Sequence, residues 1–226
     1  INRCLVGSEM CIRDRNNGGH DYGMDQIVGA DLVGSEYIFI KGDGEPDWEK
    51  ALVIANQDNT QLQVNGSDYG SPLQEGQFLF ISEYTSDNNM YISTKDPSHK
   101  LFAYQSLGRI WTESQFQNSR AANQGMFFVP PLNCSNRGDV NNIAKIDEVA
   151  NKSYTGAVTF ITKKNAEIFI NGQSISDVQN SNGPFSVTGK DDYVTYRVDN
   201  LTGNISVTGN DELYVAYFNY NGAATT

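Results

Sequence analysis

Residues 51–66 of the chain read ALVIANQDNTQLQVNG, and this stretch decides the fold class. It contains an apolar run, a polar turn, an alternating run and an Asn-Gly pair. Leu62 and Val64 alternate with glutamines, which is typical of a strand with one buried face. Asn65-Gly66 suits a type I′ hairpin, in which both central residues need positive φ. The stretch therefore predicts two antiparallel strands followed by a tight hairpin turn.

The same pattern returns at residues 157–172, which read AVTFITKKNAEIFING. The two stretches align without a gap, and their Asn-Gly pairs coincide. Further on, LFAYQSLG (101–108) resembles LYVAYFNYNG (213–222). Two matching segments in the same order predict an internal duplication of a β unit of roughly a hundred residues.

The remaining chain carries short runs rich in Val, Ile, Tyr and Phe, separated by Gly, Asn, Asp and Ser, as in strands and turns. Residues 112–122 and 143–149 are the helix candidates. The predicted fold is all-β and antiparallel, with two duplicated β-sandwich-like units; a propeller-like or single large sandwich is the alternative. The predicted strands are 36–41, 51–55, 60–64, 77–82, 89–93, 100–105, 126–129, 157–162, 166–170, 193–198, 204–208 and 212–220.

Residues 4–15, CLVGSEMCIRDR, are interpreted as translated adapter DNA and not as part of the natural protein. Back-translated with ordinary codons, VGSEMCIRDR gives GTG GGC TCG GAG ATG TGT ATA AGA GAC AGR, which looks like the end of a transposase-type library adapter. We interpret residues 1–15 as an artefactual adapter-derived segment, and expect it to be unpacked and unpaired. The first β unit is then expected at 16–131. The second is expected at 132–226, with truncation at its end left open, as part of a longer chain.

The chain is strongly acidic, with 16 Lys+Arg against 27 Asp+Glu and a formal net charge of −11. Such a charge disfavours nucleic acid as a partner, because phosphates need clustered Lys and Arg. No apolar run approaches the roughly 18 residues that cross a bilayer, so no membrane span is expected. Cys4 and Cys11 belong to the adapter segment, which leaves Cys134 without a partner for an intramolecular disulfide.

No motif marks a catalytic site. His20 and His99 are the two histidines, and neither lies in a pattern such as H-E-x-x-H or G-x-S-x-G. Nothing around Cys134 suggests the lowered thiol pKa of a nucleophile. We therefore predict no catalytic residue and no cofactor, and expect the protein not to be an enzyme.

One acidic loop has some likeness to a calcium site. In GDGEPDWE (42–49), Asp43, Glu45 and Asp47 alternate. Calcium takes six to eight oxygen ligands at defined spacing, and this loop lacks the full pattern. A solvated turn is the favoured interpretation, so no metal ligand is predicted, and calcium binding by these three residues is left open.

The chain is rich in aromatic residues, with 12 Tyr, 11 Phe and 2 Trp. We expect runs such as Phe78-Leu79-Phe80 to place their aromatic rings in the core. The candidates for exposed rings are Trp48, Trp111, Tyr69 and Tyr91, although a core or packing role is the favoured interpretation for each. An exposed ring on a β surface can stack on a sugar or contact a protein.

The order of motifs resembles the N-terminal domain of the IgGFc-binding protein family. GSEYIFI (34–40) is similar to the family's opening strand, LVIANQDNTQLQV (52–64) to its strand, turn and strand, and LQEGQFLFI (73–81) to its Leu-x-x-Gly-Glu hairpin. MYISTKDPSHKLFAYQS (90–106) and MFFVPPL (126–132) resemble the segments that complete the first half. Gln77 stands where the family more often has Glu, and the cysteines of the animal members are missing. The resemblance implies a non-enzymatic extracellular module.

The expected function is therefore an adhesion or recognition module of a large bacterial surface or secreted protein. It would bind a protein or glycan at the cell exterior, through loops 42–50, 107–125 and 178–189. A secreted carbohydrate-active enzyme is one alternative, and it needs two carboxylates roughly 5 to 10 Å apart across a cleft. A structural spacer without a ligand is the other. The sequence does not identify the ligand or the oligomeric state.

Overall fold

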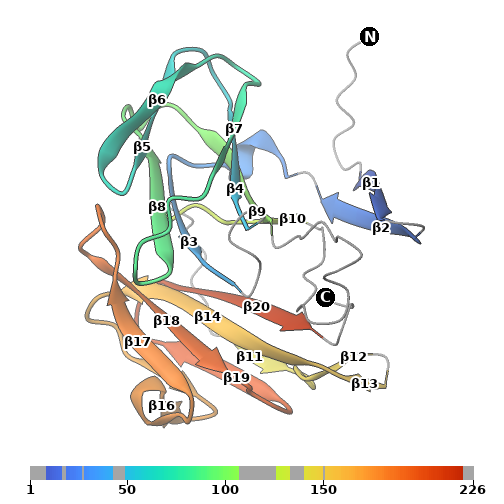
Figure 1. Ribbon diagram of the computed structural model, residues 1–226. Helices are drawn as coiled ribbons and strands as arrows, with labels where there is room; N and C mark the ends of the chain where they lie inside the picture. Colours follow the sequence, from blue (N-terminus) through green and yellow to red (C-terminus); the bar gives the residue numbers. More distant parts are fainter. Residues whose placement is uncertain are drawn as a thin grey trace.

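The computed structural model describes residues 9–16, 19–26, 28–42, 49–106, 126–132, 140–149 and 151–220. These residues form antiparallel strands and two short 3-10 turns, η1 (Ala30–Leu32) and η3 (Ile175–Asp177). Four of the sheets have four strands each, and they form two units that lie one above the other in Figure 1. The predicted all-β antiparallel fold is confirmed.

The first unit is a sandwich of two sheets with the strand orders β10-β9-β4-β7 and β3-β8-β5-β6. Its core lies between the sheets and takes alternate side chains from both, such as Tyr37 and Phe39 from one sheet and Val53 and Ala103 from the other. The strands are β3 (Glu36–Ile40), β4 (Ala51–Ala55), β5 (Thr60–Val64), β6 (Ser67–Leu73), β7 (Phe78–Ile81), β8 (Asn89–Thr94), β9 (Leu101–Ser106) and β10 (Met126–Phe128).

The second unit is a sandwich of the sheets β17-β18-β14-β20 and β11-β19-β15-β16. Its core includes Phe160 and Val198 from the first of these sheets and Ile168 and Val207 from the second. A small hairpin of β12 (Glu148–Val149) and β13 (Lys152–Ser153) lies between β11 and β14 in the sequence. The main strands are β11 (Val140–Ile143), β14 (Thr155–Lys163), β15 (Ile168–Ile170), β16 (Gln173–Ser174), β17 (Ser181–Ser186), β18 (Tyr193–Asp199), β19 (Ile205–Gly209) and β20 (Leu213–Tyr220).

The two units share one topology. The order β3-β8-β5-β6 corresponds to β11-β19-β15-β16, and β9-β4-β7 corresponds to β20-β14-β18. In the described residues, β10 of the first unit and β17 of the second have no counterpart in the other unit. The fold is thus two duplicated sandwich-like units, as expected, while the unit boundaries at residues 16, 131 and 132 stay a prediction.

The two Asn-Gly pairs form the expected hairpin turns. Asn65-Gly66 has φ angles of 50° and 82°, and Asn171-Gly172 has 51° and 79°. Each asparagine also extends the ladder to the next strand: Oδ1 of Asn65 accepts the amide of Tyr91, and Oδ1 of Asn171 accepts the amide of Ser206. The repeated Asn is therefore needed both for its left-handed backbone and for its side-chain amide.

The ungapped alignment of the repeat is wrong for its first strand. Ala51 and Val53 of β4 point into the first core, whereas Val158 and Phe160 of β14 point into the second. A shift of one residue exchanges the two faces of a strand. The sequence pattern could not reveal this shift because Ile161, on the opposite face of β14, is also packed against apolar side chains.

Two further expectations are corrected. Residues 9–15 are paired, because β1 (Glu9–Asn16) forms an antiparallel hairpin with β2 (Gly19–Gln26). Strand pairing needs only backbone N–H and C=O groups, which every residue except proline carries whatever its origin. The pairing therefore does not test the adapter interpretation, which stays a prediction. The helix candidate at 143–149 is also wrong, since Ile143 ends β11 and residues 148–149 form β12; the candidate at 112–122 lies outside the described residues.

Candidate functional site

The two units meet face to face, and their junction positions the candidate site. The outer face of the β3-β8 pair contributes Ile38 and Tyr91, and the outer face of the second unit contributes Tyr193, with Ile161 and Tyr214 packed around them. The Tyr214 hydroxyl also donates to the carbonyl of Leu132, at 2.7 Å. Buried apolar contact of this kind is the main source of adhesion between packed sheets. The junction is thus a third core between the sandwich cores.

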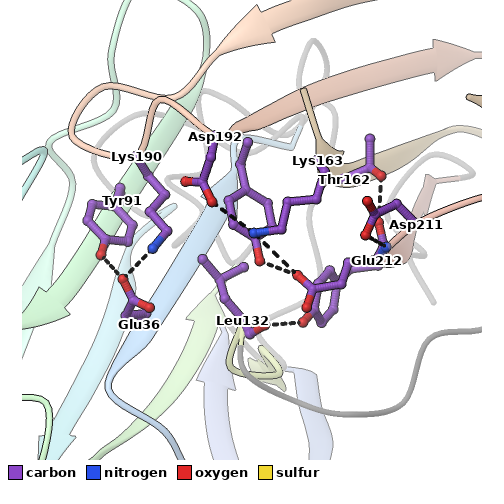
Figure 2. A network of polar contacts seen from close by, with 11 residues as sticks. Glu36, Tyr91, Leu132, Thr162, Lys163, Lys190, Asp192, Asp211 and Glu212 are labelled. Carbon is purple, nitrogen blue, oxygen red and sulfur yellow. Dashed lines mark hydrogen bonds and ion pairs between the residues drawn. The ribbon is translucent and has the colours of Figure 1, made fainter. Parts of the chain in front are cut away.

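A network of charged and phenolic groups closes one end of the junction (Figure 2). Nζ of Lys190 lies 2.7 Å from Oε1 of Glu36 in the first unit, and the hydroxyl of Tyr91 donates to the same oxygen. Burial alone would raise the pKa of Glu36, but the hydrogen bonds from Lys190 and Tyr91 outweigh it, so that the pKa lies below its ordinary value. Glu36 is therefore held as a carboxylate between the units.

The network continues within the second unit. Nζ of Lys163 lies 2.8 Å from Oδ2 of Asp192 and 3.9 Å from Oε2 of Glu212. The hydroxyl of Tyr193 donates to Glu212, and burial, followed by this hydrogen bond, raises the pKa of Tyr193. These contacts fix the face of β14 and β18 that the first unit covers.

Asn89 joins the units at the other end of the junction. It is fully buried, and its Nδ2 donates to the carbonyl of Ser186 at 3.0 Å and to Oγ1 of Thr195 at 3.1 Å. Close by, a guanidinium nitrogen of Arg197 lies 3.4 Å from the carbonyl of Lys41. Residues from both units are therefore held at defined positions around this end.

A hollow of about 500 Å³ opens at this end and is the candidate site, here called the junction pocket. Binding pockets for small ligands have volumes of a few hundred to about 1,000 Å³ and occur at domain interfaces. The junction pocket is lined by the end of β3, the β7–β8 turn, β17 and β18, through Ile40, Lys41, Gly42, Asp87, Asn88, Asn182, Phe185, Thr195, Tyr196 and Arg197.

The lining combines polar and aromatic chemistry. Lys41 and Arg197 are cationic, Asp87 is a carboxylate, and the Asn182 amide is exposed. Burial raises the pKa of Tyr196, so its phenol stays neutral and able to donate a hydrogen bond. Such a set can bind hydroxyl groups by hydrogen bonds and an apolar ligand face by ring contact.

Glycine shapes one wall of the junction pocket. Gly183, between Asn182 and Phe185, has a φ of 123° and lies directly on β18, where a Cβ would come within 2.8 Å of the Thr195 carbonyl and of the Tyr196 ring. Only glycine permits both this backbone conformation and this approach. β17 therefore bulges against β18, and the register shift between Asn182 and Phe185 follows.

A second hollow, of about 280 Å³, lies between the units nearer to β10 and β20. Its lining is mostly apolar and includes Ile38, Phe127 and Phe218, the last two in edge-to-face contact at 5.6 Å between ring centroids. It offers few groups that could orient a ligand, and the junction pocket is therefore the better candidate.

Two of the three predicted binding loops contribute to the junction pocket. Gly42 belongs to the loop 42–50, and Asn182 and Phe185 belong to the loop 178–189. The third loop, 107–125, lies outside the described residues, as do Trp48, Trp111, Cys134, Asp43, Glu45 and Asp47.

The other singled-out side chains lie elsewhere. Tyr91 is buried in the junction, in the packing role that was favoured for it, and Tyr69 is half-buried against the first core. His99 is half-buried in its turn, with Nδ1 3.3 Å from Oγ1 of Thr60. His20 lies in β2.

The prediction that the Phe78-Leu79-Phe80 run buries its rings is wrong. Leu79 packs on the first core, whereas Phe78 and Phe80 are 57% and 52% exposed and contact each other edge to face. The run alternates, as a strand must, but its larger residues occupy the outer face.

Sequence reasoning missed Asp87, Asn88, Tyr196 and Arg197. Asp87 and Asn88 resemble any polar turn, and Tyr196 and Arg197 lie within a strand whose two faces are both covered. No signal in the sequence links these residues, because two units far apart in the chain bring them together. Within the described part of the chain, no cluster of His, Cys, Asp and Glu is arranged to hold a metal ion. The same part has no helix long and apolar enough to cross a membrane.

The fold and the junction pocket define the class of this chain: a two-unit antiparallel β protein with a ligand-sized pocket where the units meet. The chain belongs to the IgGFc-binding protein family, whose model matches residues 4–218. The match begins inside the segment that we interpret as adapter-derived, and it agrees with the resemblance seen in the sequence.

Other comparisons give only distant likenesses. The apo form of a lectin from Pleurotus ostreatus is 13% identical over 98% of this chain and 80% of its own, with a TM-score of 0.18. An anti-sigma factor domain-containing protein from Clostridium clariflavum is 9% identical over 99% and 90%, with a TM-score of 0.22. TM-scores this low do not indicate a shared fold, and nothing about the ligand of this chain follows from them. No curated protein matches the chain.

Proposed function

We propose that this chain is a non-enzymatic, extracellular recognition module of a larger bacterial surface or secreted protein, and that it binds a glycan in the junction pocket. The family membership supports a binding role, and the acidic composition suits an exterior protein that avoids nucleic acid. The glycan is our more specific proposal; binding of a protein at the same pocket is the alternative.

One observation carries this proposal: polar and aromatic groups from both units line a single pocket whose base is fixed by buried hydrogen bonds. Sugars present hydroxyl groups that bond to amides, carboxylates and guanidinium groups, and C–H faces that pack on rings. Asn182, Asp87 and Arg197 supply the first kind of contact, and Phe185 and Tyr196 supply the second. Since the Asn89 bridge holds both walls, little ordering is needed on binding.

The test is a glycan and mucin array probed with residues 16–226, followed by calorimetry with each glycan that binds. Asn182→Ala removes an exposed amide whose Nδ2 donates to the nearby carbonyl of Asn180 at 3.2 Å, so we expect the fold to be little affected. Losing one hydrogen bond to the ligand costs about 0.5–1.5 kcal/mol, and we expect affinity to fall about two- to tenfold. Gln173→Ala is the matched control: this exposed amide also donates to a nearby carbonyl, of Asp177, and lies outside the pocket lining.

The alternatives give different results in the same experiment. A structural spacer binds no glycan and no mucin. A carbohydrate-active enzyme releases new reducing ends from a bound glycan. A protein-binding module gives signal on mucin that survives removal of its glycans. Equal affinities of the Asn182→Ala and Gln173→Ala variants for a bound glycan would remove the junction pocket from the proposal.

A further inference from the structure

The edge of the first unit carries a feature that the junction pocket does not explain. β7 is the last strand of its sheet in the described residues, and its sequence, FLFI, contains no charge, proline or glycine. Proteins usually protect an edge strand with such residues, because its unpaired backbone groups can bind another strand. Phe78 and Phe80 are instead exposed over more than half of their surface.

The backbone of β7 presents donors and acceptors at this edge. The amide of Ala55 donates to the carbonyl of Gln77 at 2.9 Å, which marks Gln77 as bonded to β4. Bonded and non-bonded positions alternate along an antiparallel pair, so Leu79 and Ile81 also face β4. The N–H and C=O groups of Phe78 and Phe80 therefore point away from β4, toward the open edge.

The second unit shows what fits at this position. Its strand β18 occupies the place of β7 beside the central strand, and there β17 pairs antiparallel with β18 on the far side. β17 has no counterpart beside β7 in the described residues. The duplicated architecture thus accommodates a further strand at this position, and in the first unit none of the described residues occupies it.

The charges around β7 indicate the kind of strand that would bind. Glu75 precedes β7 and Glu83 follows it, and both are exposed. Antiparallel pairing of two copies with Phe78 opposite Phe80 would bring Glu75 of one copy toward Glu83 of the other, and like charges opposite each other are destabilising. A second copy is therefore disfavoured, and a basic segment is favoured.

We propose that β7 binds an extended, basic segment of a separate protein, which adds to the sheet as an antiparallel strand in the position that β17 occupies in the second unit. Alternate apolar residues of this segment would pack on Phe78 and Phe80, and Lys or Arg residues would approach Glu75 and Glu83. Main-chain hydrogen bonds provide affinity in this mode of recognition, and alternate side chains provide specificity. This site is independent of the junction pocket.

A fluorescent heptapeptide in which lysine alternates with valine tests the proposal, with binding followed by polarisation. Two variants of the peptide separate strand addition from unspecific attraction. Valines opposite Phe78 and Phe80 would have their amides directed at β7, so N-methylation of the valines should abolish binding. N-methylation of the lysines should change the affinity less than about twofold, because those amides point away from β7.

Phe80→Lys is the matching change in the protein. It introduces a charge of the peptide's own sign and removes an apolar contact, and we expect at least tenfold weaker binding. Leu32→Lys is the control, because Leu32 is 55% exposed and lies in η1, outside β7; it should change the affinity less than twofold. Three results would each overturn the proposal: no binding of the unmodified peptide, equal binding of both methylated peptides, or equal loss in the two protein variants. Sedimentation that shows a dimer dissociated by Phe80→Lys would assign β7 to a second copy instead.

Discussion

Asn89→Ala tests whether the two units are joined by specific buried hydrogen bonds. The side chain is fully buried at the start of β8, donates to Ser186 and Thr195 of the second unit, and accepts from Oγ1 of Thr85 in its own unit at 3.0 Å. Each buried polar group left without a partner costs about 1–3 kcal/mol. The carbonyl of Ser186 belongs to an exposed residue and can accept a hydrogen bond from water instead, so most of the cost falls on the buried hydroxyl of Thr195. We expect a loss of about 2–3 kcal/mol in the free energy of unfolding.

The assay is urea unfolding of the wild type, Asn89→Ala, Thr195→Val and the double variant. Thr195→Val replaces the hydroxyl group with a methyl group of similar size, so the cycle isolates the bond between the units. A coupling free energy of about 1 kcal/mol is expected. Asn182→Ala, at the rim of the same pocket, should stay within about 0.5 kcal/mol of wild type.

The result that would refute this reasoning is a loss below about 0.5 kcal/mol for Asn89→Ala, or a coupling indistinguishable from zero. Either would mean that water replaces the amide at no cost, and that apolar contacts alone hold the units together. If the loss is as expected, Asn89→Ala should also weaken binding in the junction pocket, although Asn89 is not one of its lining residues.

Gly189→Ala should destabilise the protein by at least about 1 kcal/mol more than Gly203→Ala. Both glycines have positive φ, 84° and 74°, so alanine at either position has the same backbone cost of about 1–2 kcal/mol. A Cβ at Gly189 would in addition lie 2.5 Å from the backbone nitrogen of Gly66 in the first unit, whereas a Cβ at Gly203 meets nothing within 4 Å. Equal urea midpoints of the two variants would contradict this difference. Because the folded pKa of Glu36 lies below its ordinary value of 4.5, its contribution is present above pH 4.5 and is lost as the pH falls through the folded pKa. Wild type should therefore lose more stability than Glu36→Gln between pH 6 and pH 3, and parallel losses would exclude this role. The raised pKa of Tyr193 gives the opposite dependence of stability on pH: the contribution of Tyr193 to stability is present below its ordinary pKa of 10.0 and is lost as the pH rises through the folded pKa. Tyr193→Phe should therefore lose less stability than wild type at alkaline pH, as followed by absorbance at 295 nm.

The sequence was most informative about strands that lie inside the sheets. β4, β5, β8 and β14 were all predicted within one or two residues, because each combines β-branched or aromatic residues with clear turns on both sides. The Asn-Gly turns were predicted with their φ signs, since positive φ at both positions strongly restricts the residue types.

The candidate site was predicted only in part. Loops 42–50 and 178–189 were expected to carry recognition, and both reach the junction pocket, but Tyr196 and Arg197 come from the middle of a strand. Local sequence patterns report which faces of a strand are covered, not which distant segment covers them. The packing of β18 against the first unit could follow only from the packing of whole sheets.

The strands that the sequence did not reveal share a position. β6, β11, β16 and β17 were not predicted, and each is the outermost member of its sheet. Edge strands are half solvated and carry one set of free backbone groups, so polar residues, glycine and proline are tolerated there, as in SNGPFS of β17. β3, β7, β10 and β20 are also outermost strands in the described residues, and they were predicted because their composition is that of inner strands. β7 differs from the other three because its rings, Phe78 and Phe80, are more than half exposed. A strand with an interior composition at an open edge is expected to be covered in the working protein, and this mismatch is the physical basis for assigning it a partner.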